Sequence, residues 1–427
     1  MSLLQLPEEQ LLAREQVLSH AYTQWCAAGL KLDLTRGKPS PAQLDLSDAL
    51  LGPLEGGHLA EDGTDARNYG GLDGLPEAKR LGAALLEVGS DEVLVGGNSS
   101  LELMYRVLFF SHFFGLRPDA TPWREQGGVK FLCPVPGYDR HFSICQHLGI
   151  EMVPVALTGQ GPDMAQVEAL IGQDPSIKGI WCVPKYANPT GETYSDETVA
   201  RIAALGRIAP KDFVVMWDNA YTVHDLHTPG DALANLMELA RRLGTQTSIF
   251  ITGSTSKITH AGAGISFLAS APANLARFRA HLGMSTIGPD KVNQLRHVRF
   301  LKDESTLRAL MRQHAEILRP KFDRVLQRLE AALGGKEIAS WTSPRGGYFI
   351  SFNTLPGLAS EVVGLCRAAG VALTPAGASF PYGRDPQDSN IRLAPSFPSL
   401  EEIDRSMEVF VLCVELATLR QRLASRA

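Results

Sequence analysis

The sequence is poor in paired cysteines. Its six cysteines form no C-x-x-C pair and are widely scattered, at Cys26, Cys133, Cys145, Cys182, Cys366 and Cys413. A chain of 427 residues with this cysteine usage has no disulfide framework. The thiols are instead expected to be small buried hydrophobic groups in a reducing compartment.

Long apolar runs and a basic excess are also missing. No run of about 18 apolar residues occurs, so the sequence predicts no transmembrane helix. The first residues lack the basic, apolar and small-residue regions of a signal peptide, which favours a cytoplasmic protein. The chain carries 41 Lys+Arg against 46 Asp+Glu, a net charge of −5, which argues against nucleic-acid or membrane-surface partners.

Short β-branched runs alternate with helix-like stretches between about residues 90 and 270. This alternation predicts an α/β fold with a mostly parallel sheet of seven strands between helices. The seven predicted strands are 92–97, 129–135, 149–157, 178–184, 212–218, 248–254 and 264–270.

The pattern changes near residue 303. A long amphipathic stretch at 303–333 precedes short strands at 346–352, 371–376 and 390–394, and a last helix opens at Ser399 with Glu402 completing a capping box. We expect a smaller α+β domain here. The expected division is an N-terminal segment packing with the small domain (1–55), a large cofactor-binding domain (56–302) and a small C-terminal domain (303–427).

Reactive side chains follow three of the predicted parallel strands. Asn188, Asp218 with Tyr221, and Lys257 lie in the loops where these strands end, and such loops gather at one edge of a sheet. The set fits a pyridoxal phosphate site. The amine forms an imine with the cofactor aldehyde, the carboxylate keeps the pyridine nitrogen protonated, and the amide and phenol hold the ring's phenolate oxygen.

A phosphate site is expected nearby. The segment Gly96-Gly97-Asn98-Ser99-Ser100 follows a strand and opens a helix, and helix N-termini present free N–H groups to anions. Asn98, Ser99 and Ser254 are the expected contacts.

Four motifs occur in a familiar order: N-P-T-G at 188–191, D-N-A-Y at 218–221, S-T-S-K at 254–257 and S-N-I-R-L at 389–393. In this the chain resembles the fold-type I, class I/II aminotransferases, and most closely the aspartate aminotransferase subgroup described as MocR-like. The resemblance extends from about Leu34 to Arg392. It implies the pyridoxal-phosphate-dependent transferase fold.

The resemblance implies a role for each matching residue. Lys257 carries the cofactor and then shuttles the Cα proton, Asp218 pairs with the pyridinium nitrogen, and Tyr221 bonds the phenolate oxygen. Arg392 grips the substrate α-carboxylate, and the backbone of Gly37 faces the same group. The remaining implied contacts, to cofactor unless stated, are Asn98, Ser99, Ser100, Tyr138 (stacked on the ring), Asn188 (also near substrate), Ser254, Ser256 and Tyr69, which reaches the phosphate of a partner subunit in a homodimer with a shared active site.

One departure from the family stands out. Its phosphate-binding arginine, expected about eight residues after the lysine, is absent, and no arginine occurs before Arg277. His260, or additional hydroxyl and backbone donors, would take its place, with weaker phosphate binding or a subgroup-specific anchor as the alternatives.

The expected activity is transfer of an amino group from aspartate or another acidic amino acid to a 2-oxo acid such as 2-oxoglutarate. Another pyridoxal phosphate reaction, β-elimination or decarboxylation, and a non-catalytic sensing module remain alternatives. The cation for a second substrate carboxylate stays open among Arg36, Lys38, Arg140 and Lys185. His224 and His227 are three residues apart, but no third ligand follows, so no metal site is expected.

Overall fold

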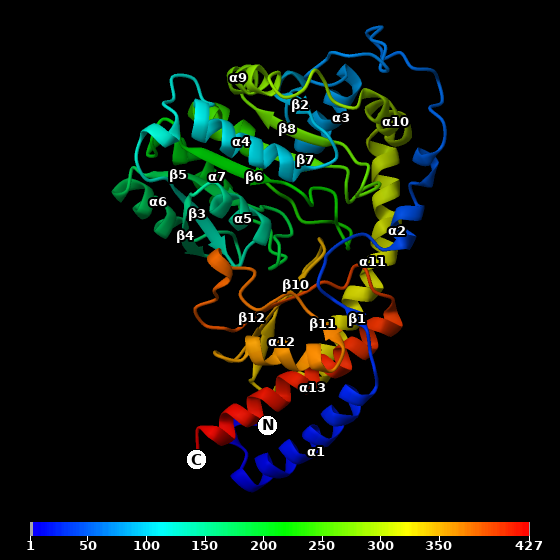
Figure 1. The fold of residues 1–427 in the computed structure, drawn as a ribbon, viewed down its shortest axis with the longest axis vertical. Coiled ribbons are helices and arrows are strands. Elements are labelled where there is room, and N and C mark those ends of the chain that lie inside the picture. The colour runs from blue at the N-terminus through cyan, green and yellow to red at the C-terminus, as the bar shows by residue number, and fades with distance from the viewer. Residues whose placement is uncertain (1–2, 427) are drawn as a thin grey trace.

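A computed structural model describes residues 3–426 of the chain (Figure 1). A seven-stranded sheet with the order β2-β8-β7-β6-β5-β3-β4 forms its centre. Each strand matches one predicted run, and only β5 begins outside its run, by one residue: β2 (Val93–Val95), β3 (Lys130–Val135), β4 (Glu151–Ala156), β5 (Ile177–Cys182), β6 (Val214–Asp218), β7 (Ile249–Ser254) and β8 (Ser266–Ser270). Pairing is parallel from β4 to β7, and only β8 runs antiparallel to β7 and β2. The predicted fold class is confirmed.

Helices cover both faces of this sheet, which is why its strands are almost continuously apolar. In β6, Val215 and Trp217 face one core, and Val214 and Met216 face the other. The helices on the first face are α3 (Pro76–Leu86), α6 (Met164–Gln173), α7 (Asp196–Ala204), α8 (Leu236–Leu243) and α10 (Lys291–Leu301). The second face carries α4 (Ser100–Phe114), α5 (Asp139–His147) and α9 (Pro272–Leu282).

A separate hydrophobic core lies at the end of the molecule where both termini are found (Figure 1). The long helix α11 (Glu304–Leu333) joins it to the large sheet. Its other helices are α1 (Glu8–Ala27), α12 (Ala359–Ala368) and α13 (Leu400–Ala424). Its strands are β9 (Ala339–Trp341), β10 (Ile350–Thr354) and β12 (Asn390–Leu393), which pair antiparallel, and β1 (Leu32–Asp33) with β11 (Val371–Ala372), which pair in parallel.

The short helix α2 (Pro41–Asp45) lies between these two parts of the chain. We propose the domain division 1–55, 56–302 and 303–427, because most of each core lies on its own side of residue 303, although Leu307, Leu310 and Met311 of α11 pack in the core of the large sheet. The strands β1 and β9 were not expected, because two or three residues carry no readable alternation.

Local signals behave as the sequence indicates. The Ser195 hydroxyl accepts a hydrogen bond from Thr198 N and caps α7, and Ser399 with Glu402 forms the capping box of α13. Among the described residues, no helix is both long and apolar enough to cross a membrane.

Candidate active site

The predicted reactive side chains meet at the carboxyl ends of the parallel strands. Asp218 ends β6, Ser254 ends β7, and Lys257 follows three residues later. Arg392 comes from β12 in the other core, and its Nη1 lies 3.3 Å from Oδ1 of Asn188. Residues from both parts of the chain therefore form one site.

Asp218 is buried and only half satisfied. Its Oδ2 lies 3.0 Å from Nε2 of His141, whereas Oδ1 is enclosed and has no hydrogen-bond partner. An unpaired buried carboxylate oxygen is costly, and it matches a ligand that offers an N–H. A protonated pyridine nitrogen fits this position.

His141 was not predicted from the sequence. Its ring stacks on Trp181, with centroids 4.1 Å apart and planes at 7°, and the edge contact with Tyr138 has a centroid distance of 4.9 Å. These contacts fix the imidazole that holds Asp218. The one sequence signal was its position three residues after Tyr138, at the start of a helix.

Lys257 lies beside the ring of Tyr221. Its Nζ lies 5.2 Å from the centroid of the Tyr221 ring. Burial lowers the pKa of Lys257, and the nearby Asp218 carboxylate opposes that shift only in part. A lower pKa favours the uncharged amine, the form that attacks an aldehyde or accepts a proton.

Two buried histidines hydrogen-bond the backbone of the loop that carries Lys257. Nε2 of His224 lies 3.3 Å from the Lys257 carbonyl oxygen, and Nε2 of His314 lies 2.9 Å from that of Ile258. Burial lowers the pKa of both rings, that of His224 to about 3, so both are neutral and donate from Nε2. Their role could not be read from the sequence, because they lie far from Lys257 along the chain.

The Tyr221 hydroxyl and the Asn188 amide are two further hydrogen-bond donors of this site. Burial, followed by the neighbouring Tyr138 and Asp218, raises the pKa of the Tyr221 hydroxyl well above its usual value, so it keeps its proton. Oδ1 of Asn188 accepts from Arg392, and among the described residues its Nδ2 donates to no protein group. Both groups suit an anionic oxygen such as the cofactor phenolate.

The N-terminus of α4 lies against the lysine loop. The Ser256 hydroxyl donates to the Asn98 carbonyl at 2.7 Å, and Nδ2 of Asn98 donates to Gly262 O at 3.3 Å. Ser99 is the N-cap, but its hydroxyl makes no capping bond. The free N–H groups and hydroxyls at Ser99 and Ser100 can therefore receive a phosphate.

His260 points elsewhere. Its Nε2 lies 3.2 Å from Leu44 O and 3.7 Å from Oδ1 of Asp48, both in the N-terminal segment. Of the two replacements considered for the missing arginine, the geometry favours hydroxyl and backbone donors.

Arg392 is 8% exposed and lies with its guanidinium carbon 5.0 Å from the centroid of the Phe349 ring. Gly37 touches the same ring, since a Cβ at this position would lie 2.3 Å from Phe349 Cζ. A larger residue here would require the Phe349 ring to shift, and the Gly37 backbone, Phe349 and Arg392 form one side of the site. Asp139, absent from the expectations, pairs with Arg392 at 3.0 Å.

Tyr69 does not join the site of its own chain. It is 84% exposed, and its ring makes no described contact. The buried Lys291 holds its loop, because Nζ donates to Asn68 O at 2.8 Å and Gly70 O at 2.7 Å. The loop is thus fixed while its aromatic side chain projects outward.

The cations considered for a second carboxylate separate into two groups. Lys185 is engaged, with Nζ 3.0 Å from Thr222 O and 2.9 Å from Oδ1 of Asp225. Arg36, Lys38 and Arg140 are exposed.

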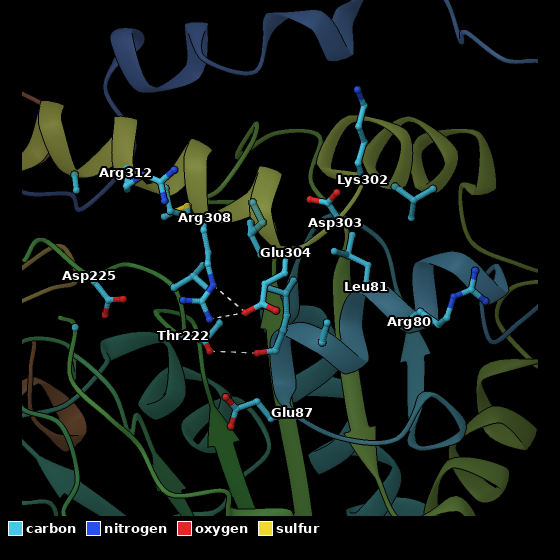
Figure 2. A pocket seen from close by; sticks show the side chains of 18 of the residues that line it. Arg80, Leu81, Glu87, Thr222, Asp225, Lys302, Asp303, Glu304, Arg308 and Arg312 are labelled. Atoms are coloured by element: carbon cyan, nitrogen blue, oxygen red, sulfur yellow. Dashed lines mark hydrogen bonds and ion pairs between the residues drawn. The ribbon is translucent and has the colours of Figure 1, made fainter. Parts of the chain in front are cut away.

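A cavity of about 1240 Å³ lies between α3, the 222–231 loop and α11. Figure 2 shows its charged wall, where the Arg308 guanidinium donates to the Glu304 carboxylate and the Thr222 hydroxyl donates to the backbone carbonyl oxygen of Leu85 in α3. Its lining includes Lys185 but none of the predicted cofactor residues. His227 lines it too, whereas His224 bonds Lys257; the described residues contain no group of three metal-ligating side chains.

Comparisons with known proteins find a matching family and related structures. The family described as aspartate amino-transferase matches residues 6–426. An aspartate aminotransferase of Corynebacterium glutamicum is 47% identical over 91% of this chain and 90% of its own. The crystal structure of an aspartate transaminase from that organism matches with a TM-score of 0.95 and 44% identity over 99% of both chains. The α-aminoadipate aminotransferase LysN of Thermus thermophilus, solved with N-(5'-phosphopyridoxyl)-L-leucine, shares the fold, with a TM-score of 0.74 and 21% identity over 94% of this chain and 95% of that one.

Proposed function

Because this chain belongs to the aspartate aminotransferase family, whose members here are pyridoxal-phosphate-dependent aminotransferases of fold type I, we propose that it moves the amino group of aspartate or another acidic amino acid to a 2-oxo acid such as 2-oxoglutarate. The observation that carries the cofactor assignment is the enclosed, unpaired Oδ1 of Asp218 at the same strand edge as Lys257. The likeness to the MocR-like subgroup is part of the proposal and rests on the sequence motifs.

Pyridoxal phosphate, when bound, supplies an electron sink that makes the substrate Cα–H acidic. Asp218, held by His141, would keep the ring nitrogen protonated, and the α4 N-terminus would hold the phosphate. Tyr138 would lie against the ring. Tyr221 and Asn188 would donate to the phenolate oxygen.

In the proposed reaction, Arg392 positions the substrate and Lys257 transfers its Cα proton. Arg392 would fix the substrate carboxylate so that the Cα–H bond faces Lys257. Burial lowers the pKa of Lys257, which favours the neutral amine, and its Nζ would accept the Cα proton and then donate it to the cofactor. Arg392 would then bind the carboxylate of the 2-oxo acid. The proton transfer would run in reverse, from Nζ of Lys257 to the Cα of this second substrate.

The proposal includes a homodimer with shared sites. Its support is the exposed Tyr69 on a loop fixed by Lys291, together with the contact of Gly288 with Gly70, where a Cβ on Gly288 would lie 2.4 Å from the carbonyl oxygen. Mixing chains that carry Tyr69→Ala with chains that carry Lys257→Ala tests this. Hybrid dimers contain one intact site, so activity should reappear; no recovery would contradict sharing.

A panel of single amino acids, each added to the cofactor-loaded protein without a 2-oxo acid, tests the function. Aspartate should bleach the visible absorbance of the bound cofactor and yield its 2-oxo acid in one equivalent. Lys257→Ala is the control that should stay unchanged. Ammonia or carbon dioxide released over many turnovers, without bleaching, would instead assign elimination or decarboxylation.

A further inference from the structure

A carboxylate of the protein itself is paired with Arg392, the arginine proposed to bind the substrate carboxylate. Oδ1 of Asp139 lies 3.0 Å from Nη1 of Arg392. Asp139 is the first residue of α5 in the large domain, whereas Arg392 belongs to β12 in the other core. The pair therefore spans the two parts of the chain at the place where a substrate carboxylate is expected.

The donors of Arg392 show which edge a ligand can reach. Nε is enclosed and has no partner, and one face of the guanidinium lies over Phe349. Nη1 also donates to Asn188 at 3.3 Å, and Nη2 donates to Thr374 Oγ1 at 3.4 Å, both long bonds. An incoming carboxylate must approach the Nη edge, where its strongest competitor is Asp139.

The two members of the pair differ in their freedom. The Arg392 side chain is 8% exposed, whereas that of Asp139 is 36% exposed. Asp139 can turn toward water, but Arg392 is fixed by its surroundings. Exchange of one carboxylate for another also leaves the arginine neutralised at every stage.

We propose that Asp139 holds the place of the substrate α-carboxylate in the empty site and is displaced from Arg392 when substrate binds. The inference rests on the proposed function. Asp139 is a positioning residue: it keeps the buried guanidinium paired and oriented, and it sets how strongly a ligand carboxylate must bind to enter. Ligands that offer a single weak acceptor would fail to displace it.

Titration with maleate, an unreactive dicarboxylate, tests the exchange in the cofactor-loaded protein by calorimetry and by the change in cofactor absorbance. Asp139→Asn removes the competing charge, so maleate should bind about three- to tenfold more tightly, as expected for a partly exposed ion pair. Asp139→Glu restores the charge and should return the dissociation constant toward that of the native protein. In steady state, Asp139→Asn should lower KM by a larger factor than it changes kcat.

Asp404→Asn is a matched control. Asp404 pairs with Arg324 and Arg328 away from the site, so its loss removes the same charge without changing maleate binding. Arg392→Gln should abolish maleate binding, which ties the signal to this arginine.

Equal or weaker maleate binding by Asp139→Asn would overturn the proposal, as would tighter binding by Asp139→Glu. The amino-acid panel separates this failure from that of the proposed function. If aspartate bleaches the cofactor while Asp139→Asn binds maleate no better, only the exchange is wrong. If no amino acid bleaches it, the proposed function fails as well.

Discussion

The strands β5 and β6 carry a buried charged cluster at each end, and the two clusters differ in how completely they are paired. At the amino ends, Nζ of Lys178 bonds Gln126 and Asp212, and Nε2 of Gln126 donates to the same Asp212 carboxylate at 2.7 Å. At the carboxyl ends, Oδ1 of Asp218 and Nε of Arg392 are enclosed without partners.

The difference separates structure from function within one sheet. A buried polar group without a partner costs free energy. Such atoms also occur away from the carboxyl ends, for example Nε of Arg117 and Oδ1 of Asn274, so the feature that marks the functional end is the unpaired carboxylate oxygen of Asp218 beside Lys257. The paired cluster stabilises the sheet. In the carboxyl-end cluster, Asp218 and Arg392 are only partly paired, and we propose that a ligand completes their hydrogen bonds. The predictions for Lys257, Lys178 and His141 test this division.

Lys257→Met should have the largest effect, on the carboxyl-end cluster. Amino transfer should fall by on the order of 10⁴-fold, because the proton-transferring amine is lost. Stability should rise at neutral pH in the cofactor-free protein. Burial lowers the pKa of Lys257 below its usual 10.5, so the unfolded chain binds more protons and the native protein gains stability as pH rises toward 10.5.

Urea unfolding at pH 7 and pH 10, beside the half-reaction with aspartate, measures both effects. The variant should lack the gain in stability between these pH values. A variant that unfolds more easily than the native chain at pH 7 would contradict the assignment of Lys257 as a costly functional group.

Lys178→Met tests the paired cluster. It leaves the buried Asp212 carboxylate without its cation, so unfolding should become easier by about 3–5 kcal/mol. The turnover number of the folded fraction should change little. Urea denaturation and active-site titration measure the two quantities, and Lys178→Met with Asp212→Asn should recover part of the stability. A loss of turnover without a loss of stability would contradict the structural role given to the Lys178 cluster.

His141→Phe should weaken cofactor binding about 10- to 100-fold by removing the partner of Asp218, an effect of the size seen when the hydrogen-bond support of a site is lost. The phenyl ring keeps the stacking on Trp181, so packing is matched. Dissociation of pyridoxal phosphate, followed by absorbance, is the measurement. His141→Asn, which retains a donor, should recover part of the affinity, and native-like binding by the phenylalanine variant would show that the 3.0 Å contact is unimportant.

Glu192→Gln should have the smallest effect. Burial raises the pKa of Glu192, at the end of the Asn188 loop, to about 7 from its usual 4.5, although Gly161 N donates to it at 2.9 Å. The folded protein therefore holds this proton more tightly, and the stability it contributes below pH 4.5 is lost as pH rises toward 7. The loss should be about 2–3 kcal/mol between pH 5 and pH 8, and the variant should not show it. Unfolding measured at pH 5 and at pH 8 tests this. An equal change in the free energy of unfolding of the native protein and of the variant would contradict the prediction.

Much of the fold was readable because each signal is local. Six of the seven strands of the large sheet lie within predicted runs, β5 begins one residue before its run, and the helix caps at Ser195 and Ser399 are confirmed. The antiparallel direction of β8 was not foreseen, because a short run looks the same in either direction. The two-residue strand β1 was also missed, since it is defined only by its partner β11.

The candidate site divides in the same way. The motifs around Asn188, Asp218 and Lys257 were found because each follows an apolar strand in the sequence. His141 was missed because its partner Asp218 is 77 residues away, and Asp139 because Arg392 is 253 residues away. Neither residue type is unusual in its own segment.

The sequence by itself determined the strands, their helical connections and the reactive groups that follow them, since these depend on neighbours along the chain. Only the tertiary structure decided which of those groups are paired and which are left unpaired, because pairing depends on residues brought together from distant segments. That distinction separates the end of the sheet that holds the protein together from the end where chemistry is proposed to occur.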